Sequence, residues 1–237
     1  MTATGNHNKR AIVTGASSGI GRQVVAQLVA ESWRVLAVAR RADRLRALAD
    51  QLEGQVFPWT ADVAADGSAT AIIDAARDQL GGLDLLVNNA GTSWVGPMAQ
   101  MPDEAIDEIL NLNVRGLILM CRAAIPLLAR SGAGQIINIS SVAADLAMET
   151  LAVYCASKAA VSMFSRVLAK ELAPQRIRVN TLSPCGTDTE IFAKMGVEVD
   201  QNQLVSAGDM ARLVVLLTQL PEGLEISDLI THKRFEP

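Results

Sequence analysis

The chain has 237 residues, of which 50% are hydrophobic, 19% charged and 3% aromatic, and its formal net charge is −4 at pH 7. This length and apolar content predict one α/β domain over residues 9–237, after a flexible tail at 1–8. The negative charge and the few aromatic residues argue against a nucleic-acid partner. The absence of a continuous apolar run of about 18 residues argues against a membrane span.

The cysteines and histidines are too few and too scattered to predict a metal site. Cys121, Cys155 and Cys185 are widely spaced, and only His7 and His232 could join them. We expect reduced thiols and no metal. With no apolar leader at the N-terminus, we expect a soluble cytoplasmic protein.

Short apolar segments alternate with helical periodicities along the whole chain. Strands are predicted at 10–14, 34–39, 56–59, 83–87, 134–141, 177–182 and 224–230. The main helices are predicted at 65–80, 103–130, 150–172 and 207–219, with others after the first and second strands. This rhythm predicts a Rossmann fold, a doubly wound parallel sheet with strand order 3-2-1-4-5-6-7, which binds ligands at the carboxyl ends of its strands.

A glycine-rich turn follows the first strand, from Thr14 to Gly21. Gly15 permits a tight turn, Gly19 lets the backbone approach a pyrophosphate, and Gly21 lets the next helix lie close to the strand. The alternative is a glycine–serine loop without a ligand. The position of the turn between a strand and a helix favours dinucleotide binding.

The end of the second strand indicates which dinucleotide is bound. NAD enzymes of this fold carry an acidic residue there for the adenosine ribose, whereas this chain has Ala39 followed by Arg40 and Arg41. The arginines predict NADP(H), with Arg40 as the main determinant and Ser17 or Ser18 as an additional donor. The alternative is a basic pair in solvent at the start of a helix.

The only tyrosine of the chain, Tyr154, precedes Lys158 by four residues, so the two side chains share a helix face. A neighbouring ammonium favours the phenolate, which makes the pair suitable for proton transfer. The alternative is a surface pair in register by chance. On the same helix we expect Ala160, Phe164, Val167 and Leu168 on the buried side.

Five motifs occur together in one order. They are T-G-x-x-x-G-x-G at 14–21, N-N-A-G at 88–91, N-x-x-G at 113–116, a serine thirteen residues before Tyr154, and Y-x-x-x-K at 154–158. Over residues 9–189 the chain therefore resembles the short-chain dehydrogenase/reductase family.

The resemblance implies a catalytic tetrad of Asn113, Ser141, Tyr154 and Lys158. Ser141, rather than Ser140, has the family spacing. Tyr154 would be the general acid and base, and Ser141 would hydrogen-bond the substrate oxygen. Lys158 would lower the pKa of Tyr154, hold the nicotinamide ribose, and end a proton relay through Asn113.

The resemblance also implies a larger set of cofactor contacts, shared among the strand ends. Besides Tyr154 and Lys158, they are Gly15, Ser17, Ser18, Gly19, Ile20, Gly21, Arg40, Arg41, Asp62, Val63, Asn89, Ala90, Gly91, Pro184, Gly186, Thr187 and Thr189. The loop at 184–189 departs from the family pattern, because Cys185 stands where glycine is usual. Either Gly186 takes over the flexible position or the loop has a different backbone.

The implied function is NADP(H)-dependent interconversion of a carbonyl and an alcohol by hydride transfer. The alternatives are an isomerase, epimerase or dehydratase on the same fold, and a dinucleotide-binding regulator without catalysis. The partners implied are a small-molecule substrate and further copies of the chain in a homo-tetramer or homo-dimer. Residues 190–206 are polar and poorly periodic, and we expect them to form a mobile substrate loop. The sequence does not identify the substrate.

Overall fold

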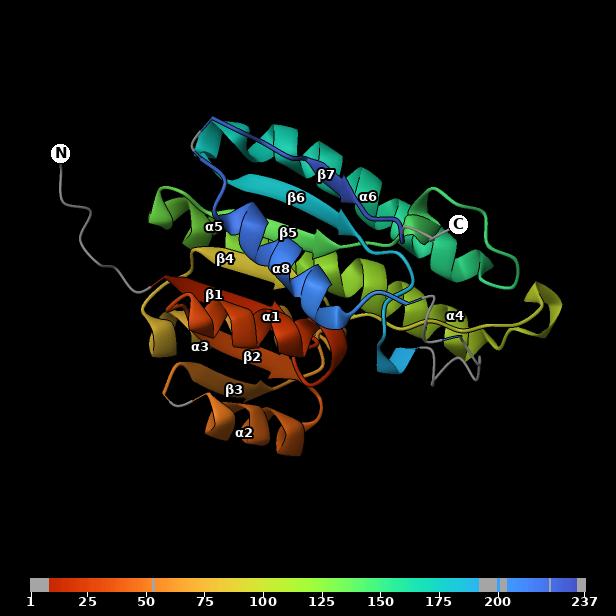
Figure 1. The fold of residues 1–237 in the computed structure, drawn as a ribbon, viewed down its shortest axis with the longest axis horizontal. Coiled ribbons are helices and arrows are strands. Elements are labelled where there is room, and N and C mark those ends of the chain that lie inside the picture. The colour runs from red at the N-terminus through yellow and green to blue at the C-terminus, as the bar shows by residue number, and fades with distance from the viewer. Residues whose placement is uncertain (1–8, 53, 192–199, 201–203, 222, 234–237) are drawn as a thin grey trace.

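The centre of the computed structural model is a seven-stranded sheet in the order β3-β2-β1-β4-β5-β6-β7 (Figure 1). Every neighbouring pair of strands is parallel. The strands are β1 (Arg10–Thr14), β2 (Arg34–Ala39), β3 (Val56–Thr60), β4 (Leu85–Asn88), β5 (Gln135–Ile139), β6 (Arg178–Ser183) and β7 (Asp228–Ile230). The predicted fold class and strand order are confirmed.

The structure describes residues 9–52, 54–191, 200, 204–221 and 223–233. The predicted tail at 1–8, and most of the substrate loop expected at 190–206, lie outside these residues.

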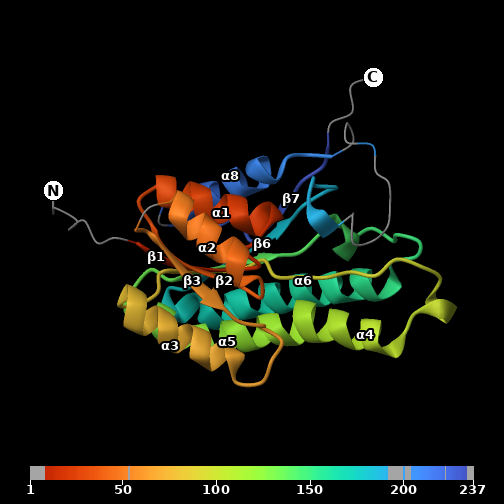
Figure 2. The same cartoon turned by 90° about the horizontal axis from the view of Figure 1, so that it is seen from below.

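Helices cover both faces of the sheet (Figure 2). One layer is formed by α1 (Gly19–Ala30), α2 (Ala42–Gln51) and α8 (Ala207–Thr218), and the other by α3 (Ser68–Leu80), α5 (Leu117–Ser131) and α6 (Ala152–Leu172). The helix α4 (Asp103–Ile109) joins α5 through a π-helical segment, η2 (Leu110–Gly116). Short 3-10 turns occur at η1 (Met98–Gln100), η3 (Val142–Ala144) and η4 (Ala173–Gln175).

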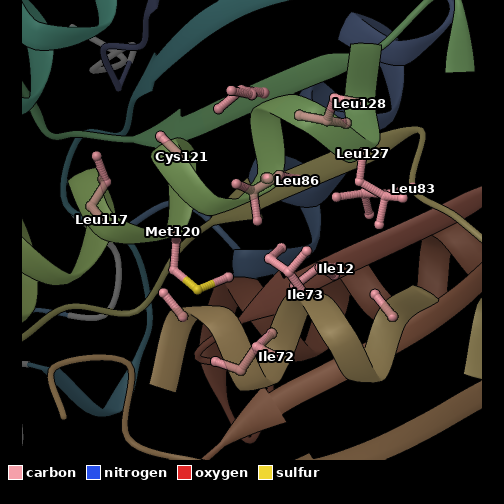
Figure 3. Packing of buried hydrophobic residues seen from close by; sticks show 14 of the residues in the cluster. Ile12, Ile72, Ile73, Leu83, Leu86, Leu117, Met120, Cys121, Leu127 and Leu128 are labelled. Atoms are coloured by element: carbon pink, nitrogen blue, oxygen red, sulfur yellow. The ribbon is translucent and has the colours of Figure 1, made fainter. Parts of the chain in front are cut away.

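The strands are apolar at consecutive positions because both faces of the sheet are buried. In β1, Ile12 belongs to the core under α3 and α5, whereas its neighbours Ala11 and Val13 belong to the core under α1 and α8. Leu86 in β4 lies with Ile12 in the first of these cores, which Figure 3 shows. The two cores hold the carboxyl ends of the strands in fixed relation.

Some predicted element boundaries differ from the structure. The third helix begins at Ser68 rather than near residue 65, because Asp62 forms a turn in which its carboxylate accepts a bond from the Ala64 amide, and Gly67 then adopts a positive φ of 75°. The last strand is limited to Asp228–Ile230. Pro58 lies in β3, which is an edge strand of the sheet, where a missing backbone donor is tolerated.

The predicted buried side of α6 was partly wrong. Ala160 and Val167 face outward, the latter with 48% of its surface exposed, whereas Val161 and Leu168 are buried. Both sides of this helix carry apolar residues, so periodicity alone could not show which side meets the sheet. The outward apolar side is available for another contact.

By length and composition, the helical run Asp103–Ala129 could cross a membrane. Its position in the fold gives a different explanation of its apolar character. Leu117, Met120 and Leu128 are buried in the core beneath the sheet (Figure 3). The apolar character of the α5 part of this run is therefore explained by its packing in the core of the domain.

Candidate active site

A cleft of about 420 Å³ lies at the carboxyl ends of the strands. Nearly all the predicted site residues line it, although they come from distant parts of the chain. They are Gly15, Ser17, Ser18, Gly19, Ile20, Arg40, Arg41, Asp62, Val63, Asn89, Ala90, Gly91, Ser141, Tyr154, Lys158, Pro184, Gly186, Thr187 and Thr189. Gly21 and Asn113 are the two predicted residues that lie outside the lining.

The turn after β1 is held by the residues that follow β4. Asn89 donates its side-chain amide to the carbonyls of Thr14 at 2.9 Å and Gly15 at 3.3 Å. In return, Thr14 Oγ1 accepts the backbone amides of Asn89 at 3.0 Å and Ala90 at 3.1 Å. Gly15 has a φ of 67°, which favours glycine. The turn therefore keeps its shape without a ligand.

Gly21 acts behind the cleft. A Cβ atom at Gly21 would lie 2.5 Å from the Gly15 carbonyl oxygen and 2.4 Å from the Asn89 side-chain nitrogen. Only glycine lets α1 begin this close to the strand end, as the sequence predicted. The N-terminus of α1 thus faces the cleft, where its free amide groups favour an anion.

The two predicted arginines after β2 differ in their surroundings. Arg40 is 55% exposed, and its guanidinium lies 3.7 Å from an Asp62 carboxylate oxygen. Arg41 instead lies along the glycine turn, where it donates to Ser17 Oγ at 3.1 Å and to Ser18 Oγ at 2.6 Å. The described structure therefore brings Arg41, more than Arg40, into direct contact with the turn.

Tyr154 and Lys158 lie one turn apart on α6, with the Lys158 Nζ atom 5.7 Å from the centre of the tyrosine ring. Nζ donates to the Ile139 carbonyl at 3.0 Å. Burial lowers the pKa of Lys158 to about 8. Burial also raises the pKa of Tyr154, and a hydrogen bond with Ser141 only partly opposes this rise. The lowered tyrosine pKa expected from the sequence is not found, because desolvation of the phenol prevails.

The two serines after β5 have different partners. Ser140 is buried, and its hydroxyl donates to the Lys158 carbonyl at 3.0 Å and lies 2.9 Å from Ser162 Oγ. Ser141 Oγ accepts the Ala143 amide at 3.1 Å, which leaves its own proton for another acceptor. This geometry agrees with the choice of Ser141 as the serine that meets a substrate.

Asn113 lies in the π-helical segment, a feature that often occurs at functional sites. Its side-chain amide donates to the Thr92 carbonyl at 2.9 Å and to Ser157 Oγ at 3.0 Å, and its oxygen accepts the Thr92 amide at 2.8 Å. A Cβ atom at Gly116 would lie 3.0 Å from the Val63 carbonyl oxygen. The N-x-x-G motif thus packs this segment beside the cleft, with the side chain of Asn113 turned into the protein.

The loop at 184–189 accommodates Cys185 without a glycine-like backbone. Neither Cys185 nor Gly186 has a positive φ. The amide of Cys185 donates to Thr231 Oγ1 at 3.0 Å, and its carbonyl accepts Thr187 Oγ1 at 2.8 Å. Gly186 therefore does not supply a left-handed conformation in place of the usual glycine, and the backbone of the loop is anchored by bonds to side-chain hydroxyls.

Comparison with known proteins shows the family of the chain. A protein-family model described as short chain dehydrogenase matches residues 9–199. This chain belongs to the short-chain dehydrogenase family. The family places it among the oxidoreductases of alcohol and carbonyl groups.

Individual relatives of this short-chain dehydrogenase cover most of its length. It is 38% identical to D-threitol dehydrogenase from Mycolicibacterium smegmatis over 78% of this chain and 73% of that protein. It is 34% identical to D-erythrulose reductase from Gallus gallus, over 96% and 87% of the two chains. A solved structure of 3-ketoacyl-(acyl-carrier-protein) reductase from Brucella melitensis, complexed with NADH, has a TM-score of 0.87 at 29% identity, with 95% and 97% of the two chains covered.

Sequence reasoning missed an apolar wall and an ion-pair cluster in the cleft of this short-chain dehydrogenase. Val142, Met148 and Leu151 add an apolar wall near Tyr154, and no motif marks them. Glu190, the first residue of the expected substrate loop, lines the cleft and forms ion pairs with Arg41 and Arg44 that were not predicted. Its 149-residue separation from Arg41 explains why no local pattern marks this contact.

The lowered pKa of Lys158 predicts how the stability of the protein changes with pH. Between about pH 8 and pH 10.5 the unfolded chain retains a proton on Lys158 that the folded chain has lost, so the unfolding free energy rises with pH. Across this window, the unfolding free energy of the wild-type protein should rise by roughly 3 kcal/mol more than that of Lys158→Met, because methionine does not titrate. Urea unfolding at a series of pH values measures the difference. A constant difference would show that burial does not perturb this ammonium.

Proposed function

We propose that this short-chain dehydrogenase is an NADP(H)-dependent oxidoreductase that interconverts a ketone or aldehyde with an alcohol. The observation that carries the proposal is the meeting of Ser141, Tyr154 and Lys158 in the cleft that the glycine turn also lines. The cleft thereby contains a hydrogen-bond donor, a proton donor and a cation, together with the N-terminus of α1, which suits a phosphate.

The residues present suit a nicotinamide dinucleotide. The backbone at Gly15 and Gly19 lies open to a pyrophosphate, while Asp62 and Val63 lie at the adenine end of the lining. Pro184 and the loop up to Thr189 would close over the nicotinamide end. The bound cofactor supplies or accepts a hydride, so the protein has to position the substrate and move one proton.

Tyr154 performs the proton transfer in this proposal. In reduction its phenol donates a proton to the substrate oxygen, and in oxidation the phenolate removes that proton. Ser141 donates a hydrogen bond to the same oxygen as negative charge develops. The Lys158 ammonium stabilises the phenolate that Tyr154 leaves behind, which offsets the effect of burial on that group. Because the side chain of Asn113 is already paired with Thr92 and Ser157, any part in the relay would use its main-chain atoms.

Replacing Tyr154 with Phe tests this role directly. The ring remains, but the proton donor is lost, so turnover should fall by ~10² to 10⁴-fold while the cofactor still binds. Steady-state rates and the cofactor dissociation constant measure the two effects. More than about a tenth of the wild-type rate in the variant, with cofactor binding intact, would exclude Tyr154 as the acid.

The relatives suggest the first substrates to examine. They are named for D-threitol and D-erythrulose, a short polyol and a short ketose. We propose short ketoses and their polyols as the first candidates, followed by ketones and aldehydes that suit the apolar wall at Val142, Met148 and Leu151. Net consumption of the reduced cofactor during turnover distinguishes an oxidoreductase from an isomerase or a non-catalytic regulator.

The preference for NADP(H) is supported by the residues at the end of β2. The position that holds an acidic residue in NAD enzymes is Ala39, and Arg40 and Arg41 follow it in the cleft lining. Residue 39 itself carries no carboxylate that would repel a 2′-phosphate, and guanidinium groups bind phosphate well.

Replacing Arg40 with Ala should weaken NADP(H) binding by at least roughly tenfold and leave NAD(H) binding nearly unchanged. Titration of both cofactors on the parent and the variant measures this. Arg46→Ala is the matched control, because Arg46 is exposed on α2 and lies outside the cleft lining. Equal affinities for the two cofactors in the parent, or an equal loss for both in Arg40→Ala, would contradict the assignment.

We also propose that the protein forms a homo-tetramer or homo-dimer through α6 and the adjoining α5. Ala160, Met163 and Val167 repeat at helical spacing on the outer side of α6, with Met163 57% and Val167 48% exposed. A second copy would cover this apolar stripe. Light scattering at micromolar concentration should give a multiple of the 25.1 kDa chain mass. Val167→Asp should shift the mass toward the monomer, whereas a monomeric parent would refute the assembly.

A further inference from the structure

A carboxylate from the loop after β6 already binds the arginines next to the glycine turn. Glu190 accepts a hydrogen bond from Arg41 Nη1 at 2.7 Å and another from Arg44 Nη1 through its other oxygen. Arg41 is held at the same time by Ser17 and Ser18. One acidic residue thus joins the loop after β6 to the start of α2.

The position of this ion-pair cluster matters for cofactor choice. Arg41 lies two residues after the end of β2 and contacts both serines of the turn, which is where the proposed function places the 2′-phosphate of the adenosine ribose. A phosphate and a carboxylate use the same guanidinium donors. One hydrogen of the Arg41 Nη1 group is therefore engaged by Glu190, whose charge lies where a phosphate would approach.

We propose that Glu190 is a specificity-determining residue, whose carboxylate competes with the 2′-phosphate of NADP(H) for the guanidinium groups of Arg41 and Arg44. This inference rests on the proposed preference for NADP(H). A phosphate that takes the place of the carboxylate displaces Glu190 from Arg41 Nη1, and a phosphate that uses the second hydrogen of Nη1 still meets the negative charge of Glu190. NAD(H), which has hydroxyl groups only on this ribose, does not require the exchange.

Protonation does not relieve the competition near neutral pH. Hydrogen bonds from Arg41 and Arg44 lower the pKa of Glu190 to about 2, so the carboxylate stays ionised. Arg40 differs from the other two arginines, because its contact with Asp62 spans 3.7 Å. The exposed Arg40 can approach a phosphate while Glu190 still occupies Arg41, which gives the two arginines separate roles.

The test compares binding of adenosine 2′,5′-bisphosphate and AMP to the parent protein and to Glu190→Gln by calorimetry. These probes carry or lack the 2′-phosphate and need no turnover. The variant should bind the bisphosphate about three- to tenfold more tightly, as expected for the loss of partly exposed ion pairs, and AMP within about twofold. NADP⁺ and NAD⁺ should repeat this contrast. Asp188→Asn is the matched control, since Asp188 is an exposed acid two residues away.

A second comparison locates the effect at Arg41. In an Arg41→Ala background, Glu190→Gln should change the affinity for the bisphosphate by no more than it changes the affinity for AMP. Glu190→Ala repeats the measurement without any side-chain hydrogen bond from residue 190. No gain in both Glu190 variants, an equal gain for AMP, or an equal gain in Asp188→Asn would overturn the inference. Equal binding of NADP⁺ and NAD⁺ by the parent would instead refute the proposed NADP(H) preference. The ratio of the bisphosphate dissociation constants of parent and Glu190→Gln would still test the role of Glu190.

Discussion

The cleft depends on a contact that excludes side chains at the end of β1. Gly15 and Gly21 approach each other so closely that a single Cβ atom at Gly21 would overlap the Gly15 carbonyl. Asn89 fills the remaining space and uses its amide to hold the carbonyls of Thr14 and Gly15. The start of α1 is therefore fixed against β1 and β4 together. This contact sets the position of the α1 N-terminus, whose free amide groups face the cleft and favour an anion there.

The proton-transfer end of the cleft depends on polar contacts between α6 and the sheet. Ser140 holds the Lys158 carbonyl, and Lys158 in turn donates to the Ile139 carbonyl. Deeper in the protein, Asn138 donates to Ser165. Satisfied buried hydrogen bonds of this kind orient a helix more uniquely than apolar packing does. The orientation has a cost, because burial disfavours the charged form of Lys158 that the proposed chemistry uses.

The adenosine end shows why the number of arginines is a poor guide to phosphate affinity. Arg40, Arg41 and Arg44 all lie near the turn, but Asp62 and Glu190 supply carboxylates to them. A ligand phosphate therefore meets guanidinium groups that already have partners, and the net gain is the difference between two sets of ion pairs. These ion pairs are partly exposed, so each contributes little free energy on its own. The geometry of the cluster decides which pair a phosphate replaces.

The amino-acid sequence by itself determined the features that arise from short-range order. Apolar strands alternating with helices led to the seven-stranded fold, and the glycine spacing led to the strand–turn–helix at 14–21. A separation of four residues sufficed to put Tyr154 and Lys158 on one side of a helix. These predictions succeeded because backbone geometry links neighbours in the chain directly.

Only the tertiary structure decided how those elements meet. Which side of α6 is buried could not be predicted, because apolar residues such as Val161 and Val167 occur on both sides and the choice depends on the helix packing against β6 and η2. Burial, a property of the assembled core, reversed the expected direction of the Tyr154 pKa shift. The contact between Glu190 and Arg41 joins residues 149 positions apart. No local sequence pattern marks such a pair, because the two residues follow different strands and meet only when the sheet has formed.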